Sequence, residues 1–243
     1  MSILKFLGSG SAFNTKLGNT SAYYKHGNQM LLIDCGSNIF HRIKESGVLE
    51  GVEHIHTLIT HTHADHVGSL ADLILYTYYS HGEFAKPKVT IYSLNATGVK
   101  EVLKLNGCVE DIHFDFVNVR YDNIINITPL QVLIMKPIET NHVDELSSFG
   151  YELVIEGKGV YYSGDTKDIN KEDLEWINKG FFPYVYIDTC KADYEGNVHI
   201  SLRKLAELIK PEHREKVYCM HLDEGFVREE AESLGFNVVE NEF

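Results

Sequence analysis

Three histidines and one aspartate occur within residues 61–66, which read His-Thr-His-Ala-Asp-His. Neutral imidazole and carboxylate groups are ligands that suit zinc, manganese or iron. In extended backbone, residues two apart project to the same side, so His61 and His63 can bind one ion. Asp65 and His66, on a chain that must then turn, can face a second ion. The density of these side chains favours two adjacent metal ions over a solvated polar turn.

Short apolar runs alternate with turns and helical patterns along the chain, which predicts the α/β class. The cluster follows an expected strand at 56–59 and precedes an expected helix at 68–79. The other expected strands are 3–7, 21–24, 30–34, 89–92, 112–119, 131–138, 150–155, 159–163, 184–189 and 216–221. The other expected helices are 39–45, 98–105, 172–178 and 201–209. Strands with interleaved helices thus occur in both halves of the chain. This pattern predicts a sandwich of two sheets flanked by helices, with the site along one edge.

Length and composition are those of an ordinary globular protein. Of the 243 residues, 44% are hydrophobic and 23% are charged, and no segment reads as a linker. We therefore expect one domain that spans residues 1–243. The formal net charge of −13 makes long nucleic acid a less favoured partner. Bound divalent ions would nevertheless add positive charge where an anionic substrate docks.

The cysteines and the apolar runs indicate where the protein acts. Cys35, Cys108, Cys190 and Cys219 form no C-x-x-C pair, which argues against a zinc finger, a thioredoxin-type site or a dense disulfide framework. No apolar run approaches the roughly 18 residues of a membrane span, and the N-terminal run is too short for a signal peptide. We expect a cytoplasmic protein without a membrane partner, in the host cytoplasm if a phage encodes it.

Three further residues of metal-binding type follow expected strands, where loops on a rigid scaffold tend to carry function. They are His142, Asp165 and His221. A lone loop histidine is more often structural, and Asp165 could instead cap a helix before the acidic stretch 167–175. A carboxylate with two oxygens can also bridge two cations that would otherwise repel each other. The residues alone leave both interpretations open.

The order of these elements resembles the metallo-β-lactamase superfamily. Residues 61–66 match its His-x-His-x-Asp-His signature, and residues 163–166 match its Ser-Gly-Asp-Thr element. The resemblance implies a four-layer αβ/βα sandwich with two divalent metal ions, which would be zinc or alternatively manganese. It also implies the ligands of the ions, with His61, His63 and His142 on the first, Asp65, His66 and His221 on the second, and Asp165 between them. Asp65 would keep a proton-accepting role on the nucleophile side as well.

Residues 195–201, Glu-Gly-Asn-Val-His-Ile-Ser, place a histidine before a serine at a helix start and resemble the phosphodiesterase members of this superfamily. In those enzymes a histidine at a helix start lies near the scissile phosphate and, with an acidic neighbour, assists the leaving oxygen. The resemblance implies that His199 is the proton donor and that Glu195 or Asp193 is its acidic neighbour. The chain departs from the pattern, because it reads His-Ile-Ser where the family reads His-Ser-Thr. In the alternative interpretation, Ser201 caps a helix and His199 is merely exposed.

Within this branch, the chain is similar to the anti-Pycsar proteins of phages and their bacterial relatives. The similar elements are Gly-Ser-Gly-Ser-Ala-Phe at 8–13, Asp-Cys-Gly at 34–36 and Asn-Val-His at 197–199. These proteins hydrolyse small cyclic mononucleotides to linear monophosphates and are homodimers, and the resemblance implies both properties here. It also implies that Asp34 supports the ligand loops. The Gly-rich opening either brings backbone amides near a phosphate or is simply a tight turn.

Three alternatives remain open. Residues 149–151, Phe-Gly-Tyr, resemble the transfer-RNA 3′-processing endonucleases (ribonuclease Z), but the chain is short, lacks their Gly/Pro-rich arm and has the wrong net charge. A thioester or lactone hydrolase would need neither His199 nor residues 149–151. A non-catalytic nucleotide-binding protein would not need a complete ligand set. The aromatic candidates for stacking a nucleobase are Tyr76, Tyr78, Tyr79, Phe114, Phe116 and Phe226.

Overall fold

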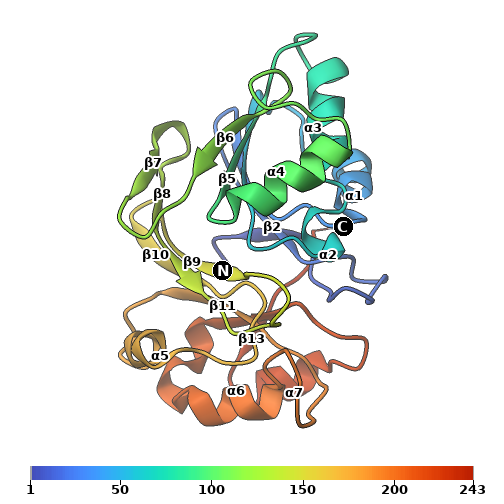
Figure 1. Ribbon diagram of the computed structural model, residues 1–243. Coiled ribbons are helices and arrows are strands. Elements are labelled where there is room, and N and C mark those ends of the chain that lie inside the picture. The colour runs from blue at the N-terminus through green and yellow to red at the C-terminus, as the bar shows by residue number, and fades with distance from the viewer. Residues whose placement is uncertain (1, 243) are drawn as a thin grey trace.

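The first half of the chain forms a six-stranded sheet with helices packed on its outer face (Figure 1). A computed structural model describes residues 2–242 of the protein. In sheet order, the strands are β1 (Lys5–Gly8), β2 (Ser21–His26), β3 (Gln29–Ile33), β4 (His54–Leu58), β5 (Val89–Ser93) and β6 (Asp115–Asn118). The helices of this half are α1 (Ile39–Ser46), α2 (Ala64–Val67), α3 (Leu70–Tyr79) and α4 (Ala96–Leu105).

The second half forms a seven-stranded sheet with its own outer helices. In chain order, the strands are β7 (Ile125–Ile127), β8 (Val132–Glu139), β9 (Phe149–Ile155), β10 (Lys158–Tyr162), β11 (Tyr184–Asp188), β12 (Val217–Met220) and β13 (Asn237–Val238). The α-helices are α5 (Lys171–Ile177), α6 (Leu202–Leu208) and α7 (Arg228–Ser233), and the 3₁₀ turns are η1 (Thr128–Leu130) and η2 (Pro211–Lys216). None of the helices in residues 2–242 has the length and apolar character that crossing a membrane requires.

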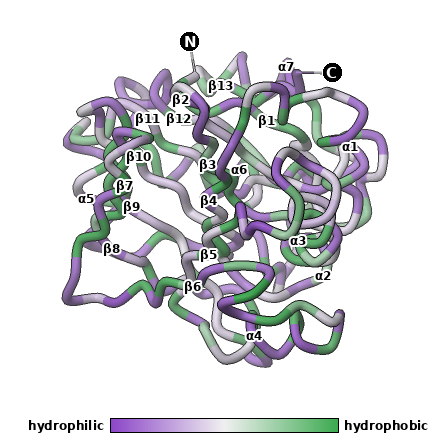
Figure 2. The backbone as a smooth tube through the Cα atoms, turned by 90° about the horizontal axis from the view of Figure 1, so that it is seen from above, coloured by the Kyte–Doolittle hydropathy of each residue, from purple (hydrophilic) through white to green (hydrophobic). Residues whose placement is uncertain are grey.

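Apolar side chains separate into three clusters that define four layers. One cluster lies between the two sheets and includes the buried rings of Tyr151, Tyr162 and Tyr186. A second lies between the first sheet and α1, α3 and α4, and a third lies between the second sheet and α5, α6 and α7. Figure 2 shows the same order from above, with β3, β4 and β5 between α3 and the strands β8 and β9. The expected αβ/βα sandwich of the α/β class is therefore confirmed.

Strand direction brings the carboxyl ends of β4, β8, β10, β11 and β12 to one edge of the sandwich. Strands β3 to β6 are mutually parallel, and so are strands β10 to β13. Strand β9 is antiparallel to both β8 and β10, so β8 points the same way as β10. Binding sites of open α/β sheets lie beyond the carboxyl ends of such strands. The fold therefore gathers the loops that follow these five strands.

The structure differs from the expected elements where close packing or a turn interrupts a periodic pattern. The helix expected at 68–79 is preceded by the separate helix α2, and Gly68 packs so closely on Ala64 and Ser37 that a Cβ would not fit. The strand expected at 112–119 is limited to β6, because Asp111 takes a left-handed conformation (φ 64°) in the turn before it. Strands β7 and β13 are too short for their periodicity to show, and α7 was also missed.

The four cysteines are buried free thiols. Burial raises the pKa of Cys35, Cys190 and Cys219 to about 12. A thiol with such a pKa stays protonated and is a poor nucleophile and metal ligand. The cysteines therefore serve packing in this fold.

Two histidines on β4 form a polar network away from the candidate ligands. The hydrogen bonds of His56 assign a neutral ring, with Nδ1 accepting from the Tyr92 hydroxyl (2.9 Å) and Nε2–H donating to Gln29 Oε1 (3.0 Å). His54 Nε2 lies 2.8 Å from the Thr90 hydroxyl. Burial, reinforced by the neighbouring His54, lowers the pKa of His56 to about 4. Between about pH 4 and pH 6.5, the ring of His56 is therefore neutral in the folded protein and protonated in the unfolded chain.

We expect the free energy of unfolding to decrease as the pH falls from about 6.5 to about 4, because the unfolded state then binds more protons at His56. The full pKa difference corresponds to a loss of up to about 3 kcal/mol. Urea unfolding at about pH 7.5 and about pH 5 should show a smaller loss in His56→Gln than in the wild type. The control His41→Gln changes an exposed side chain and should keep the wild-type loss. An equal loss in His56→Gln and wild type would contradict the assignment.

Candidate metal centre

The candidate ligands follow strand ends in both sheets. His61 comes three residues after β4, and the chain then enters α2, which carries Asp65 and His66. In the second sheet, His142, Asp165 and His221 each follow β8, β10 or β12 within three residues. All seven expected ligands, His63 included, belong to two groups of side chains whose ligand atoms lie within 4.8 Å of one another.

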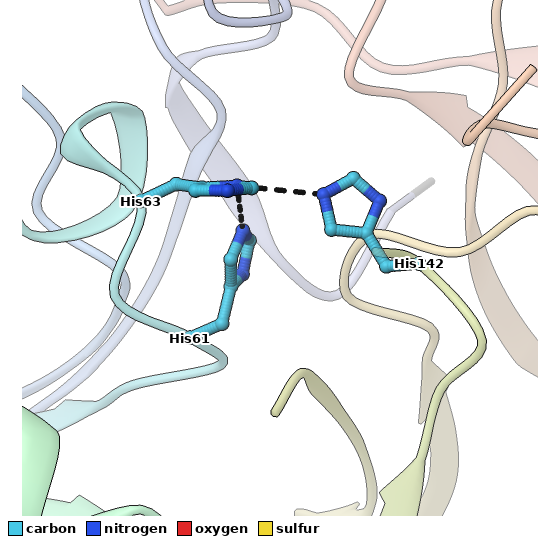
Figure 3. A group of neighbouring side chains, drawn as sticks. All are labelled: His61, His63 and His142. Carbon is cyan, nitrogen blue, oxygen red and sulfur yellow. Dashed lines mark hydrogen bonds between the residues drawn. The ribbon is translucent and has the colours of Figure 1, made fainter. Parts of the chain in front are cut away.

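The first group consists of His61, His63 and His142 (Figure 3). Their rings point toward one another, two from the loop after β4 and one from the loop after β8. His63 Nδ1 lies 3.0 Å from His61 Nε2 and 3.4 Å from His142 Nε2. The rings of His61 and His142 are buried. Two of the three converging nitrogens are therefore shielded from solvent.

This arrangement fits a metal ion. A tetrahedral zinc ion with bonds of about 2.0–2.1 Å holds its nitrogen ligands about 3.3 Å apart, close to the two spacings at His63. The Nδ1–H of His142 donates to the Val198 carbonyl (3.1 Å), which directs the Nε2 lone pair inward. Burial and the neighbouring His66 hold the pKa of His61 well below its usual value. The neutral ring is the form that binds metal.

The second group consists of Asp65, His66, Asp165 and His221. His66 Nε2 lies 3.3 Å from an oxygen of each carboxylate. His221 Nε2 lies 3.4 Å from Asp65 Oδ2 and 3.3 Å from Asp165 Oδ2. The buried Nε2 of His66 forms no hydrogen bond with any other residue in 2–242, which is costly for a buried polar atom. A divalent ion among two carboxylates and two imidazoles would satisfy it.

Asp165 connects the two groups. Its Oδ2 also lies 3.9 Å from His61 Nε2 and 3.8 Å from His142 Nε2. Burial favours the protonated acid, but the surrounding histidines outweigh it and hold the pKa of Asp165 well below its usual range. An ionised carboxylate in this position can bridge two cations. The preceding Gly164 takes a left-handed conformation (φ 58°), and a Cβ there would overlap the backbone of Phe149.

Asp34 supports the ligands from below, as expected from the sequence. Its carboxylate accepts hydrogen bonds from the Thr60 amide (2.8 Å), the Thr60 hydroxyl (2.7 Å) and His66 Nδ1–H (2.8 Å). The bond to His66 fixes that ring with Nε2 toward the second group. Burial lowers the pKa of His66, but the carboxylates of Asp165, Asp65 and Asp34 outweigh burial and raise it well above its usual value. The same negative charge favours a bound cation.

His199 lies beside both groups and is held by a buried carboxylate. Its Nδ1–H donates to Asp188 Oδ2 (2.7 Å), and its ring centre lies 5.1 Å from that of His142 and 4.9 Å from that of His221. Burial alone would lower the pKa of His199, but the carboxylate of Asp188 raises it above its usual value. Ser201 does cap α6, as the alternative interpretation holds, yet His199 is directed at the site.

The acidic neighbours expected for His199 lie elsewhere. Asp193 forms an ion pair with Arg203 (2.6 Å) on the surface. Glu195 is exposed and forms no hydrogen bond or ion pair with another residue of the described chain. The expectation that Glu195 or Asp193 holds His199 is therefore corrected to Asp188. Asp188 ends a strand that is directed at the site, whereas Asp193 and Glu195 belong to an exposed loop.

A cavity of about 470 Å³ opens onto both groups. Its polar lining consists of His63, Asp65, His142, Asp165, His221, His199 and Ser37. Its apolar lining consists of Ala12, Phe13, Ala64, Val143 and Val198. The volume is in the range of about 300–1,000 Å³ that is common for small-molecule sites.

Other residues singled out in the sequence lie outside this cavity. Gly150 packs against carbonyl groups of β10, and the Tyr151 hydroxyl donates to the Ile59 carbonyl (2.7 Å). This pair therefore positions the end of β4 and does not line the cavity. None of the six aromatic candidates lines the cavity, and Phe114 is buried in the core. The aromatic residue of the lining is Phe13, which is not among those six candidates.

The chain is similar in sequence to known proteins along nearly its whole length. The sequence pattern of one family, anti-Pycsar protein Apyc1, matches residues 2–242. An anti-Pycsar protein Apyc1 of Bacillus phage BSP38 is 32% identical over 232 residues, which cover 90% of this chain and 88% of that protein. A ribonuclease Z of Mycobacterium avium (strain 104) is 25% identical over 228 residues, which cover 88% of this chain and 75% of that protein.

A solved structure shows the same fold. The metallo-beta-lactamase fold protein YhfI from Bacillus subtilis superposes with a TM-score of 0.75 at 15% identity, covering 99% of this chain and 97% of YhfI. The similarity to the metallo-β-lactamase superfamily that the ligand motifs indicated is therefore confirmed. The resemblance to the anti-Pycsar proteins and the more distant one to ribonuclease Z are confirmed as well.

We expect Asp165→Asn to lose bound metal, because the neutral amide cannot balance two cations and no longer offers two anionic oxygens. Metal analysis of purified protein after loading and dialysis should give two ions per chain for the wild type and fewer than one for the variant. Asp144→Asn, which changes an exposed carboxylate in the His142 loop, is the matched control. Circular dichroism should show that both variants are folded. Two retained ions in Asp165→Asn would refute the bridging role.

Proposed function

The chain belongs to the anti-Pycsar protein Apyc1 family, and we propose that it is a phosphodiesterase that uses two divalent metal ions to hydrolyse 3′,5′-cyclic mononucleotides to linear monophosphates. Zinc is the proposed metal, with manganese as the alternative. The observation that carries the proposal is His199, which is fixed by Asp188 and lines the same cavity as the ligand groups. A thioester or lactone hydrolase would not need this histidine.

Each residue of the proposed site has a separate task. The seven residues would hold the two cations, which when bound would supply an acidified water and positive charge opposite the phosphoryl oxygens. Asp65 accepts a proton from the attacking water, whose oxygen bonds to phosphorus while the bond from phosphorus to O3′ breaks. His199 donates a proton from Nε2 to the departing O3′. Asp188 holds Nδ1–H and so determines which nitrogen of His199 faces the substrate.

The dimensions and charge of the protein support a small substrate. The cavity of about 470 Å³ suits a mononucleotide-sized ligand. The net charge of −13 opposes the approach of a long polyanion. Transfer-RNA 3′ processing is the second candidate function, and the similarity to a ribonuclease Z is the observation that favours it.

The proposal includes the setting in which the protein acts. Hydrolysis of cyclic mononucleotides would remove the messengers of cyclic-nucleotide antiphage signalling. We place the protein in the cytoplasm, which is the host cytoplasm if a phage encodes it, and we propose a homodimer by analogy with the family.

We expect the metal-loaded wild type to convert cyclic CMP, UMP, AMP and GMP to linear monophosphates and to leave a precursor transfer RNA uncut. Chromatography of the nucleotides and gel analysis of the RNA measure both outcomes in parallel. Asp165→Asn should be inactive on all substrates, because it lacks the bridging carboxylate. Cleavage of the RNA alone would replace the proposed function by the second candidate.

We expect His199→Ala to lower kcat by about 10²- to 10⁴-fold, the usual contribution of a positioned general acid. Because His199 is not among the seven proposed ligands, the variant should retain the wild-type metal content. The exposed His41→Ala is the control and should keep full activity. Full activity of His199→Ala, or loss of metal in step with activity, would contradict its role as proton donor.

A further inference from the structure

Phe13 is the most exposed aromatic residue among residues 2–242, with 87% of its surface accessible, and it lines the metal cavity. The exposed ring of Phe84, in contrast, lies outside this cavity and has an aromatic neighbour in Tyr79. An apolar ring kept in water at the opening of a polar site offers a flat face to a ligand. The position of Phe13 therefore bears on what the cavity binds.

The fold sets the place of this ring. The Ser11 amide donates to the Leu222 carbonyl (3.0 Å), and the side-chain amide of Asn14 donates to the same carbonyl (3.0 Å). Leu222 directly follows His221, so the loop that carries Phe13 is tied to a proposed metal ligand. These two hydrogen bonds hold the backbone of the loop, and so the point from which the Phe13 ring projects, next to the metal groups.

The same loop also presents free backbone donors. The amides of Ser11 and Asn14 donate to backbone carbonyls, whereas those of Ala12 and Phe13 form no hydrogen bond within the described chain. Ala12 and Phe13 are the two residues of the loop that line the cavity. The Gly-rich opening is thus a tight turn, and its two amides without a hydrogen bond in the described chain belong to residues that line the cavity.

Resting on the proposed function, we infer that Phe13 forms a nucleobase subsite, in which its ring stacks on the base of the nucleotide whose phosphodiester lies at the metal groups. Every base has a π-face, so stacking on one aromatic ring accepts purines and pyrimidines alike. Val143 and Val198 add apolar surface to the same cavity. The subsite therefore binds a flat heterocycle and contributes to affinity without touching the reacting atoms.

Steady-state kinetics of Phe13→Ala on cyclic AMP and cyclic CMP test the inference. We expect KM to increase by about 5- to 100-fold for both substrates, the range that loss of one stacking contact gives, while kcat changes little. Phe13→Trp should restore the wild-type KM, because it keeps an aromatic face. A 3′,5′-cyclic ribose phosphate that carries a methoxy group in place of the base should have the same KM for wild type and Phe13→Ala.

Phe84→Ala is the matched control, because it removes an exposed phenylalanine (72% accessible) outside the cavity. Calorimetric titration of linear AMP should show weaker binding to Phe13→Ala and unchanged binding to Phe84→Ala. Wild-type hydrolysis with an unchanged KM in Phe13→Ala would overturn the subsite alone. So would an equal KM increase for the baseless substrate, or dissociation of an oligomer by the substitution. Absence of wild-type hydrolysis of every cyclic nucleotide would instead overturn the proposed function.

Discussion

The carboxylate of Asp165 is the interaction on which the rest of the site depends. It is buried, and one of its oxygens lies within 3.9 Å of imidazole nitrogens from both sheets, namely those of His61, His66, His142 and His221. A buried charge needs compensating partners, and removal of a partner from such a network typically costs about 3–5 kcal/mol. The two sheets must therefore pack in the one arrangement that brings these nitrogens around the Asp165 carboxylate. Metal binding and the packing of the sheets are consequently two results of the same constraint.

Two non-glycine residues accept an unfavourable backbone conformation to meet this constraint. Asp34 (φ 62°) and His221 (φ 59°) both lie in the left-handed region at the end of a strand. Such conformations cost about 1–3 kcal/mol each and persist only where the surroundings impose them. At Asp34 the compensation is visible in three hydrogen bonds to its carboxylate. At His221 the conformation turns the ring from the end of β12 toward Asp65 and Asp165.

The sequence predicts the part of the site that is local and misses the part that depends on tertiary structure. The high density of histidine and aspartate in residues 61–66 indicates a metal site from the sequence alone. The remaining proposed ligands follow from family motifs in chain order. Asp188 was missed, although an aspartate at the end of an apolar strand is the same signal that marked Asp165. Proximity along the chain favoured Glu195 wrongly, because a short loop can point away from its neighbour. Phe13 was missed since periodicity does not report which way a Gly-rich loop turns.

The composition of the cavity links chemistry to substrate range. Apart from Ser37, the polar side chains of its lining are His199 and proposed metal ligands, which face the phosphodiester in the proposed reaction. Strong discrimination between bases requires polar groups that are left unpaired when the wrong base binds. In the proposed reaction, apolar contact with Phe13, Val143 and Val198 would supply no such penalty, so the site would discriminate between phosphodiesters more strictly than between bases. A phosphodiesterase with such a site would hydrolyse purine and pyrimidine cyclic nucleotides alike, because its selectivity would lie in the geometry of the phosphodiester.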